Sequence, residues 1–270
     1  MLPSPSEFRE LVSGRRRGVK AALWRTAFRA AEVPYTLAMR LRNRRYDRGK
    51  AEIRRVAVPV VSVGNLTLGG TGKTPMVEWI ARWFRRQGVR VTIVSRGYGA
   101  EAGSRNDEAM ELEQRLPDVP HVQNPDRVEA AEMAIEEFAC ELLLLDDAFQ
   151  HRRIARDLDL VLLDSLEPFG YGHVFPRGTL REPLSGLRRA DGIVLSRADL
   201  LDPAAREAIR REALRFAPDA CWAEAVHRPR AYVALDGGEQ PLDSLRKAAV
   251  AAFCGIGNPQ AFFGTLSKLG

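Results

Sequence analysis

The sequence predicts an α/β fold, in which a parallel β-sheet carries helices on both faces and a basic amphipathic helix comes first. Two observations lead to this prediction. Short apolar runs, typical of buried strands, alternate with helical stretches after residue 56. The expected strands are residues 56–63, 89–94, 142–145, 160–163, 193–195 and 249–253, and the expected helices are 75–87 and 127–138. Such alternation favours a parallel sheet, because each helix returns the chain to the same edge.

The second observation is the uneven charge of the chain. Its net charge is +6, yet residues 15–50 alone hold twelve Lys or Arg against Glu32 and Asp47. This end is expected to meet an anionic partner. No recognised nucleic-acid module accompanies the basic residues, so we expect no nucleic-acid partner. Three widely spaced cysteines favour a reducing compartment, and the charged N-terminus does not resemble a signal peptide.

Residues 15–45 are expected to form a helix that is broken or kinked near Pro34. Val19, Leu23, Ala27 and Ala31 share one stripe, with Trp24 and Phe28 beside it. Such a helix suits an interface with anionic lipid, and the alternative is a helix packed on its own domain.

A glycine-rich segment between the first strand and the first core helix is the strongest chemical signal. Glycines let backbone N–H groups surround phosphate oxygens, and the following helix N-terminus adds positive potential. Lys73 would reach the β- and γ-phosphates, and Thr74 would offer its hydroxyl to Mg²⁺. The segment, which predicts a P-loop NTPase-type sheet that binds ATP, reads Thr67, Leu68, Gly69, Gly70, Thr71, Gly72, Lys73 and Thr74.

A pair of acids follows the strand expected at 142–145. Asp146 and Asp147 would reach the carboxyl edge of the sheet beside the phosphate loop, where carboxylates hold Mg²⁺. We therefore expect Lys73, Asp146 and Asp147 to be catalytic, with Thr74, Asp146 and Asp147 as metal ligands.

The ordered set of motifs resembles the tetraacyldisaccharide 4'-kinase family from about residue 15 onward. The motifs that carry the resemblance lie at residues 63–65, 69–75, 95–99, 146–152, 156–159, 180–183, 189–191 and 255–259. The resemblance implies phosphorylation of a lipid A disaccharide precursor with ATP and Mg²⁺ at the cytoplasmic face of the inner membrane. It also implies that the basic N-terminal helix meets the membrane.

Further site residues follow from this resemblance. The position of the family's catalytic base matches Asp107, although both flanking residues differ from the family motif. We expect Gln150 and His151 to bind the substrate or to orient the acids. Residues 165–190 look like a functional excursion or a mobile loop. Three residues in it, Arg177, Arg181 and Glu182, are expected to contact the sugar or its existing phosphate.

Two questions stay open from the sequence. A membrane-associated partner-switch ATPase or GTPase shares the Gly-Gly-x-Gly-Lys-Thr pattern, but Leu68 stands where such ATPases carry Lys. Related chains continue into a His-containing segment that assists the base, whereas this sequence stops at Gly270. We expect an interface region (1–50), a kinase core (51–247) and the start of a C-terminal α/β portion (248–270) that is cut short.

Overall fold

The computed structural model describes residues 3–97, 107–255 and 259–269, and its centre is a seven-stranded sheet of order β3-β2-β4-β1-β5-β6-β7. Every neighbouring pair of strands is parallel, which confirms the predicted sheet. A separate antiparallel pair, β8–β9, follows in the chain. The strands are β1 (Val60–Asn65), β2 (Val91–Ser95), β3 (His121–Gln123), β4 (Leu142–Asp146), β5 (Leu158–Asp164), β6 (Gly192–Ser196), β7 (Cys221–Glu224), β8 (Tyr232–Val233) and β9 (Glu239–Gln240).

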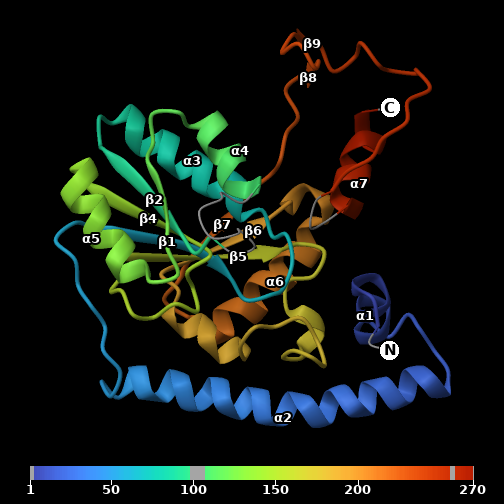
Figure 1. The fold of residues 1–270 in the computed structure, drawn as a ribbon. Coiled ribbons are helices and arrows are strands. Elements are labelled where there is room, and N and C mark those ends of the chain that lie inside the picture. The colour runs from blue at the N-terminus through green and yellow to red at the C-terminus, as the bar shows by residue number, and fades with distance from the viewer. Residues whose placement is uncertain (1–2, 98–106, 256–258, 270) are drawn as a thin grey trace.

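Helices cover both faces of this sheet, as predicted (Figure 1). On one face, α3 (Lys73–Arg86) and α4 (Asp107–Arg115) pack on the apolar side chains of β1, β2 and β4. On the other face, α5 (Arg127–Phe138) and α6 (Pro203–Phe216) close two further apolar clusters. The last helix is α7 (Pro259–Leu269). Short 3-10 turns at Gly170–Gly172, Leu184–Arg189 and Ala198–Leu200 complete the connections.

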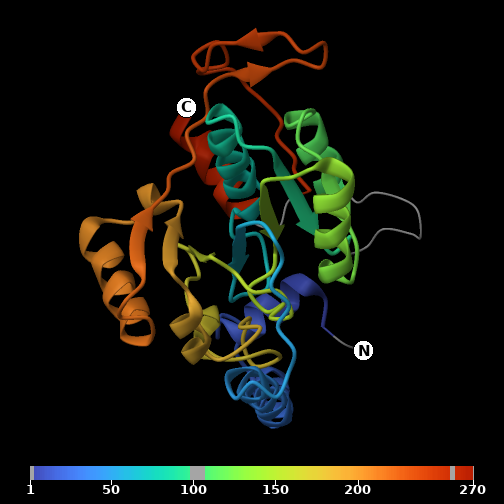
Figure 2. The ribbon, with the colours of Figure 1, turned by 90° about the vertical axis from the view of Figure 1, so that its left-hand side faces the viewer.

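The basic N-terminal segment forms a separate layer beneath the core, which Figure 2 shows with its long helix nearly end-on. Helix α1 (Pro5–Val12) packs on α2 (Val19–Asp47), and α2 runs unbroken through Pro34. A break near Pro34 was therefore wrongly predicted, because one missing N–H is tolerated where the rest of the helix is held by packing, and the alternative of a kink there stays a prediction. Among the described residues, no helix is both long enough and apolar enough to cross a bilayer.

The two faces of α2 differ from the expected arrangement. Phe28 is buried, and its ring centroid lies 5.6 Å from that of Phe8 and 5.4 Å from that of Trp24. Phe28 therefore packs within the protein, which corrects its predicted place at an interface, and Trp24 packs half-buried against it. The exposed apolar side chains lie on the opposite side of the helix, and they are Val19, Leu23, Val33, Leu37 and Leu41.

One expected strand is absent from the structure. Residues 249–253 have no strand partner among the described residues, and Phe253 is almost fully exposed. An apolar run becomes a strand only when a neighbour pairs with its backbone, which is why this prediction was wrong. The excursion at 165–190 is a packed segment whose buried side chains include Leu180 and Leu187.

Because Gly64 has no side chain, the backbone at the end of β1 can lie close to the segment that follows β4. A Cβ on Gly64 would lie 2.6 Å from the Cβ of Phe149 and 2.7 Å from its backbone nitrogen. Phe149 is fully buried and begins the segment that leads away from the acids. The close approach of these two backbones keeps Asn65 beside residues 146–150.

We expect Gly64→Ala to destabilise the fold, because the added methyl group meets backbone rather than a flexible side chain. The cost should be about 1–3 kcal/mol in the free energy of unfolding. Urea denaturation of Gly64→Ala against Gly255→Ala measures it, since a Cβ on Gly255 meets no atom within 4 Å. Equal midpoints for the two variants would contradict the packing argument.

Candidate active site

The glycine-rich segment connects β1 to α3 at the carboxyl edge of the sheet. Gly69 and Gly72 have φ values of 128° and 86°, which side chains with a Cβ rarely adopt. Lys73 begins α3, and its Nζ donates to Asn65 Oδ1 at 3.3 Å. The loop and helix therefore form a shape that can cradle phosphate groups.

The first two residues of the predicted nucleotide loop have another partner. The Leu68 N–H donates to the Thr179 carbonyl at 2.7 Å, and Thr67 forms an antiparallel bridge with Leu180. The Arg181 N–H in turn donates to the Leu66 carbonyl at 2.6 Å. Residues 179–182, which we call the strap, therefore pair with the start of the loop. The Leu68 N–H is already used in this pairing.

Asp147 lies directly beside the loop. Its Oδ1 is 3.6 Å from Lys73 Nζ, and Arg181 Nη1 donates to both carboxylate oxygens at 2.8 and 2.9 Å. Burial acts to raise the pKa of Asp147, but the cations of Lys73 and Arg181 outweigh it and hold the pKa below its usual value. Asp147 is thus an anion at neutral pH, and its positive φ of 48° aims it away from the path of the strand.

A buried arginine supports the turn that carries both acids. Arg127 Nη2 donates to the carbonyls of Asp146 and Asp147, at 3.1 Å each. Asp146 ends β4 and is paired in register with Val63 of β1. The sequence therefore placed both acids correctly at the carboxyl edge, and β1 and β4 are neighbours there.

Three side chains at this edge of the sheet could offer oxygen atoms to a metal ion. Asp146, Asp147 and the Thr74 hydroxyl are hard ligands of the kind that Mg²⁺ prefers. Among the described residues, no group of three or more His, Cys, Asp or Glu is arranged to hold a metal ion. A magnesium ion that arrives with a nucleotide needs fewer protein ligands, because phosphate oxygens and waters complete its shell. The residues present thus fit a nucleotide-borne ion.

Gln150 and His151 follow the acids into the interior. Gln150 Nε2 donates to the Asn65 carbonyl at 2.9 Å and to Glu182 Oε1 at 3.2 Å. Burial, followed by the positive charges of Arg127 and Arg156, lowers the pKa of His151 to about 4. His151 is therefore neutral at physiological pH, and it carries no charge toward a phosphate.

The three predicted residues of the excursion have different places. Arg181 is at the site, bound to Asp147. Arg177 lies half-buried in the same excursion. Glu182 is fully buried, and its carboxylate accepts hydrogen bonds from Asn43, Gln150 and Arg189. The expected contact of Glu182 with the sugar is corrected, because the protein's own donors occupy its carboxylate.

Asp107 begins α4, and its side chain lies outside the described part of the chain. Its predicted role as the base stays a prediction.

Sequence reasoning missed two residues that the fold brings to the loop. Arg197 donates to the Gly70 carbonyl at 3.1 Å and to Asp164 at 2.8 Å. The His227 ring lies against Gly72, where a Cβ would meet its Cε1 at 3.3 Å. Burial and the charge of Arg197 lower the pKa of His227. The sequence signal for both residues was weak: Arg197 follows β6 and His227 follows β7, and the carboxyl ends of these parallel strands lie at the same edge of the sheet.

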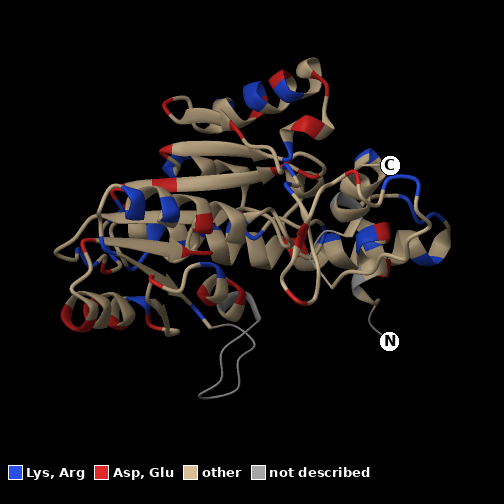
Figure 3. Cartoon of the chain, turned by 90° about the horizontal axis from the view of Figure 1, so that it is seen from above, with Lys and Arg blue, Asp and Glu red and all other residues tan. Residues whose placement is uncertain are grey.

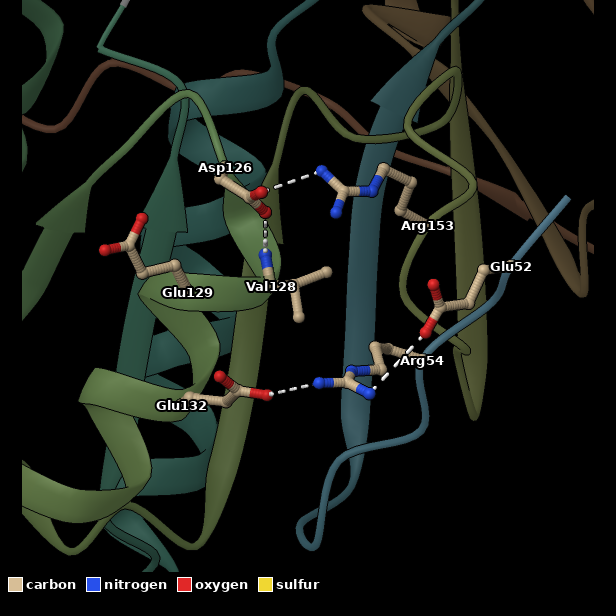
Figure 4. A pocket seen from close by; sticks show the side chains of 7 residues that line it. All are labelled: Glu52, Arg54, Asp126, Val128, Glu129, Glu132 and Arg153. Carbon is tan, nitrogen blue, oxygen red and sulfur yellow. Dashed lines mark hydrogen bonds and ion pairs between the residues drawn. The ribbon is translucent and has the colours of Figure 1, made fainter.

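A hollow on another part of the surface, with a volume of about 430 Å³, lies between α5 and the connection from α2 to β1 (Figure 4). Its charged side chains pair with one another: Arg54 with Glu52 and Glu132, and Arg153 with Asp126. These side chains are mostly about half exposed, so the pairs stabilise the surface only weakly. The loop and the acids, rather than this hollow, form the candidate active site.

Comparison with known proteins identifies the family. A sequence model of the family "Tetraacyldisaccharide-1-P 4'-kinase" matches residues 24–270. The chain belongs to this family. A tetraacyldisaccharide 4'-kinase of Anaeromyxobacter sp. (strain K) is 42% identical over 94% of this chain and 72% of its own length. The corresponding protein of Geobacter sulfurreducens is 36% identical over 97% of this chain and 77% of its own.

A solved structure agrees with this assignment. The LpxK protein of Aquifex aeolicus, crystallised in complex with ATP, superposes with a TM-score of 0.69 at 29% identity, covering 91% of this chain and 78% of that one. Family membership decides between the two interpretations left open by the sequence, in favour of the tetraacyldisaccharide-1-P 4'-kinases and against a partner-switch NTPase. The phosphate loop, both acids and the strap all lie within the part of the chain that this family matches.

We expect His151 to make the stability of this family member depend on pH. Its pKa is about 4 in the folded chain against an ordinary value of 6.5, so between these values the unfolded state binds a proton that the folded state does not. The free energy of unfolding should therefore fall as the pH is lowered from 6.5 toward 4. Between pH 7 and pH 5, the loss from this residue should be about 1–2 kcal/mol.

Urea titrations at pH 7 and pH 5 give the change in the free energy of unfolding for wild type and for His151→Gln. The difference between these two changes is the contribution of His151. Asp159 titrates in the same range with the opposite sign, since burial raises its pKa to about 6, but its contribution is common to both proteins and cancels. The same pH dependence in both proteins would contradict the buried, neutral state of His151.

Proposed function

We propose that this chain transfers the γ-phosphoryl group of ATP to the 4'-hydroxyl of a tetraacyldisaccharide 1-phosphate, a step of lipid A biosynthesis. The observation that carries the proposal is the approach of Lys73 to Asp147, 3.6 Å apart at the mouth of the phosphate loop. Family membership supplies the acceptor, since the relatives are named for this activity.

The nucleotide is bound by the segment from Gly69 to Thr74. Its backbone N–H groups and the N-terminus of α3 receive the phosphate oxygens, and Lys73 offsets the charge that develops during transfer. Asp146, Asp147 and the hydroxyl of Thr74 would hold Mg²⁺. When it is bound, the ion neutralises negative charge on the phosphates and orients them.

The acceptor hydroxyl attacks the γ-phosphorus as the bond to the ADP oxygen breaks. Asp107 takes the hydroxyl proton late in this transfer. Arg177 and Arg181 stand on the excursion, where a guanidinium fork suits the phosphate or the hydroxyl groups of the sugar. Gln150 and neutral His151 orient the segment after the acids.

The chain also binds an anionic membrane surface, through α2, at the cytoplasmic face of the inner membrane. The outward stripe of α2 is apolar and exposed, with Val19 78%, Leu23 66% and Leu37 55% accessible. Arginines flank this stripe, whereas both signs of charge are mixed over the core (Figure 3). A helix of this kind lies in the interface, with its apolar side among the acyl chains and its cations near lipid phosphates.

Lys73→Ala tests the kinase proposal. Loss of the cation should lower kcat roughly a thousandfold, because its charge acts on the transferring phosphoryl group. Phosphorylation of the lipid disaccharide by the variant is compared with that by Arg211→Ala, which removes an exposed cation from α6. A variant within a few-fold of wild type would exclude this loop as the phosphoryl-transfer site.

Leu37→Gln combined with Leu41→Gln tests the membrane proposal. Vesicle binding should weaken roughly tenfold or more, because two side chains no longer gain from leaving water. Cosedimentation with vesicles that contain anionic lipid measures it, and Leu235→Gln, which changes a fully exposed leucine outside α2, is the control. Unchanged binding of the double variant would show that the stripe does not meet the bilayer.

A further inference from the structure

The inner side of α2 holds a row of polar groups that reach the loops around the active site. Glu32 Oε1 accepts from the Val174 N–H at 3.0 Å, and the Tyr35 hydroxyl donates to the Arg181 carbonyl at 3.1 Å. Asn43 Nδ2 donates to Glu182 Oε2 at 2.8 Å. These residues lie at helical spacing on the side opposite the exposed stripe. One side of the helix thus binds the catalytic core while the other is open.

Tyr35 acts on the strap at Arg181. The backbone of Arg181 is held from two sides, since its N–H donates to the carbonyl of Leu66, directly before the phosphate loop, and its own carbonyl accepts from Tyr35. Its side chain makes the paired hydrogen bonds to Asp147. The hydroxyl of Tyr35 therefore binds the backbone of the same residue whose guanidinium holds the catalytic carboxylate.

Asn43 acts through the buried carboxylate of Glu182. The same carboxylate accepts from Gln150, and Gln150 also donates to the Asn65 carbonyl. The side chain of Asn65 accepts from Lys73. A continuous chain of hydrogen bonds thus runs from the α2 side chain to the lysine of the phosphate loop.

We propose that Tyr35 and Asn43 are positioning residues for phosphoryl transfer, so that α2 holds the strap and thereby sets the places of Asp147 and Lys73. The inference rests on the proposed kinase function. Neither residue touches the reacting groups. Each acts through one strap residue, and both lie on the helix whose other side is exposed. Undocking α2 would release the strap and lower the catalytic rate.

Tyr35→Phe is the sharpest test, because it deletes one hydroxyl and keeps the ring beside Phe175. Its matched control is Tyr46→Phe on the same helix. Tyr46 packs under the guanidinium of Arg152, and its hydroxyl forms no hydrogen bond with the described residues. We expect Tyr35→Phe to lower kcat roughly tenfold, since small misplacements of reacting groups are costly. Tyr46→Phe should retain the wild-type kcat.

The split between kinetic constants separates positioning from simple stabilisation. For Tyr35→Phe, we expect KM for ATP to change by less than about twofold, and the unfolding temperature to stay within a few degrees of that of Tyr46→Phe. A purely structural contact would lower the unfolding temperature and leave kcat unchanged below it. A kcat equal to that of Tyr46→Phe overturns the proposal. A wild-type chain without kinase activity overturns the proposed function itself, which is a distinct result.

A double-mutant cycle tests the route of the effect. Tyr35→Phe acts through Arg181, so adding it to Arg181→Ala should lower kcat no further. In the same way, Asn43→Ala should cost nothing more in a Gln150→Ala background. Fully multiplicative losses in both cycles would show that the α2 residues act independently of the strap, and they would overturn the relay.

Discussion

A single buried carboxylate, that of Glu182, connects α2, the segment after the acids and the 3-10 turn that ends at Arg189. It is fully shielded from water and accepts hydrogen bonds from α2, from the segment after the acids and from Arg189. An isolated charge in such a place would be prohibitively costly, and it persists because every donor around it is in position. Removing one partner of a buried ion pair typically costs about 3–5 kcal/mol. The packing of the strap, and with it the loop, therefore depends on this group.

Paired charges also organise the site before a nucleotide binds. Asp147 stands between Lys73 and Arg181, and both cations lower its pKa against the opposing effect of burial. Two cations against one carboxylate leave this cluster with a net positive charge, which suits an incoming phosphate. In the proposed nucleotide complex, phosphate oxygens would compete with Asp147 for Lys73, and the carboxylates of Asp146 and Asp147 would be the ligands offered to Mg²⁺.

The parts of the fold that could be predicted are those encoded by neighbouring residues. The phosphate loop, the acids after β4 and most central strands follow from local apolar runs, glycines and turn positions. The false strand at 249–253 has the same local pattern but lacks a partner, and pairing is not a local property. The short strands β3 and β7 were missed for the opposite reason. Their sequences lack a run of Val, Ile or Leu, and pairing with β2 and β6 holds them in the sheet.

Long-range contacts mark the limit of sequence reasoning at the site. Asn43 and Glu182 are 139 positions apart, and Tyr35 and Arg181 are 146 apart, so no spacing rule connects them. The family motif placed Arg181 and Glu182 together as substrate residues, whereas the structure separates their roles by burial. Arg181 and Glu182 are neighbours in the chain, yet the side chain of the first reaches Asp147 while that of the second is buried in the interior.

The two-sided character of α2 also explains why its pattern was difficult to interpret. An amphipathic helix normally shows one apolar stripe, but α2 has an apolar outer stripe and, opposite to it, an inner side that combines Phe28 with Tyr35 and Asn43. Arginines occupy the flanks between them, so the average amphipathicity is small although each side is well defined. A helix that only anchored the chain would need the outer stripe alone. The polar inner side binds α2 to the strap and to the loop before it, while the outer stripe is left for the proposed contact with lipid.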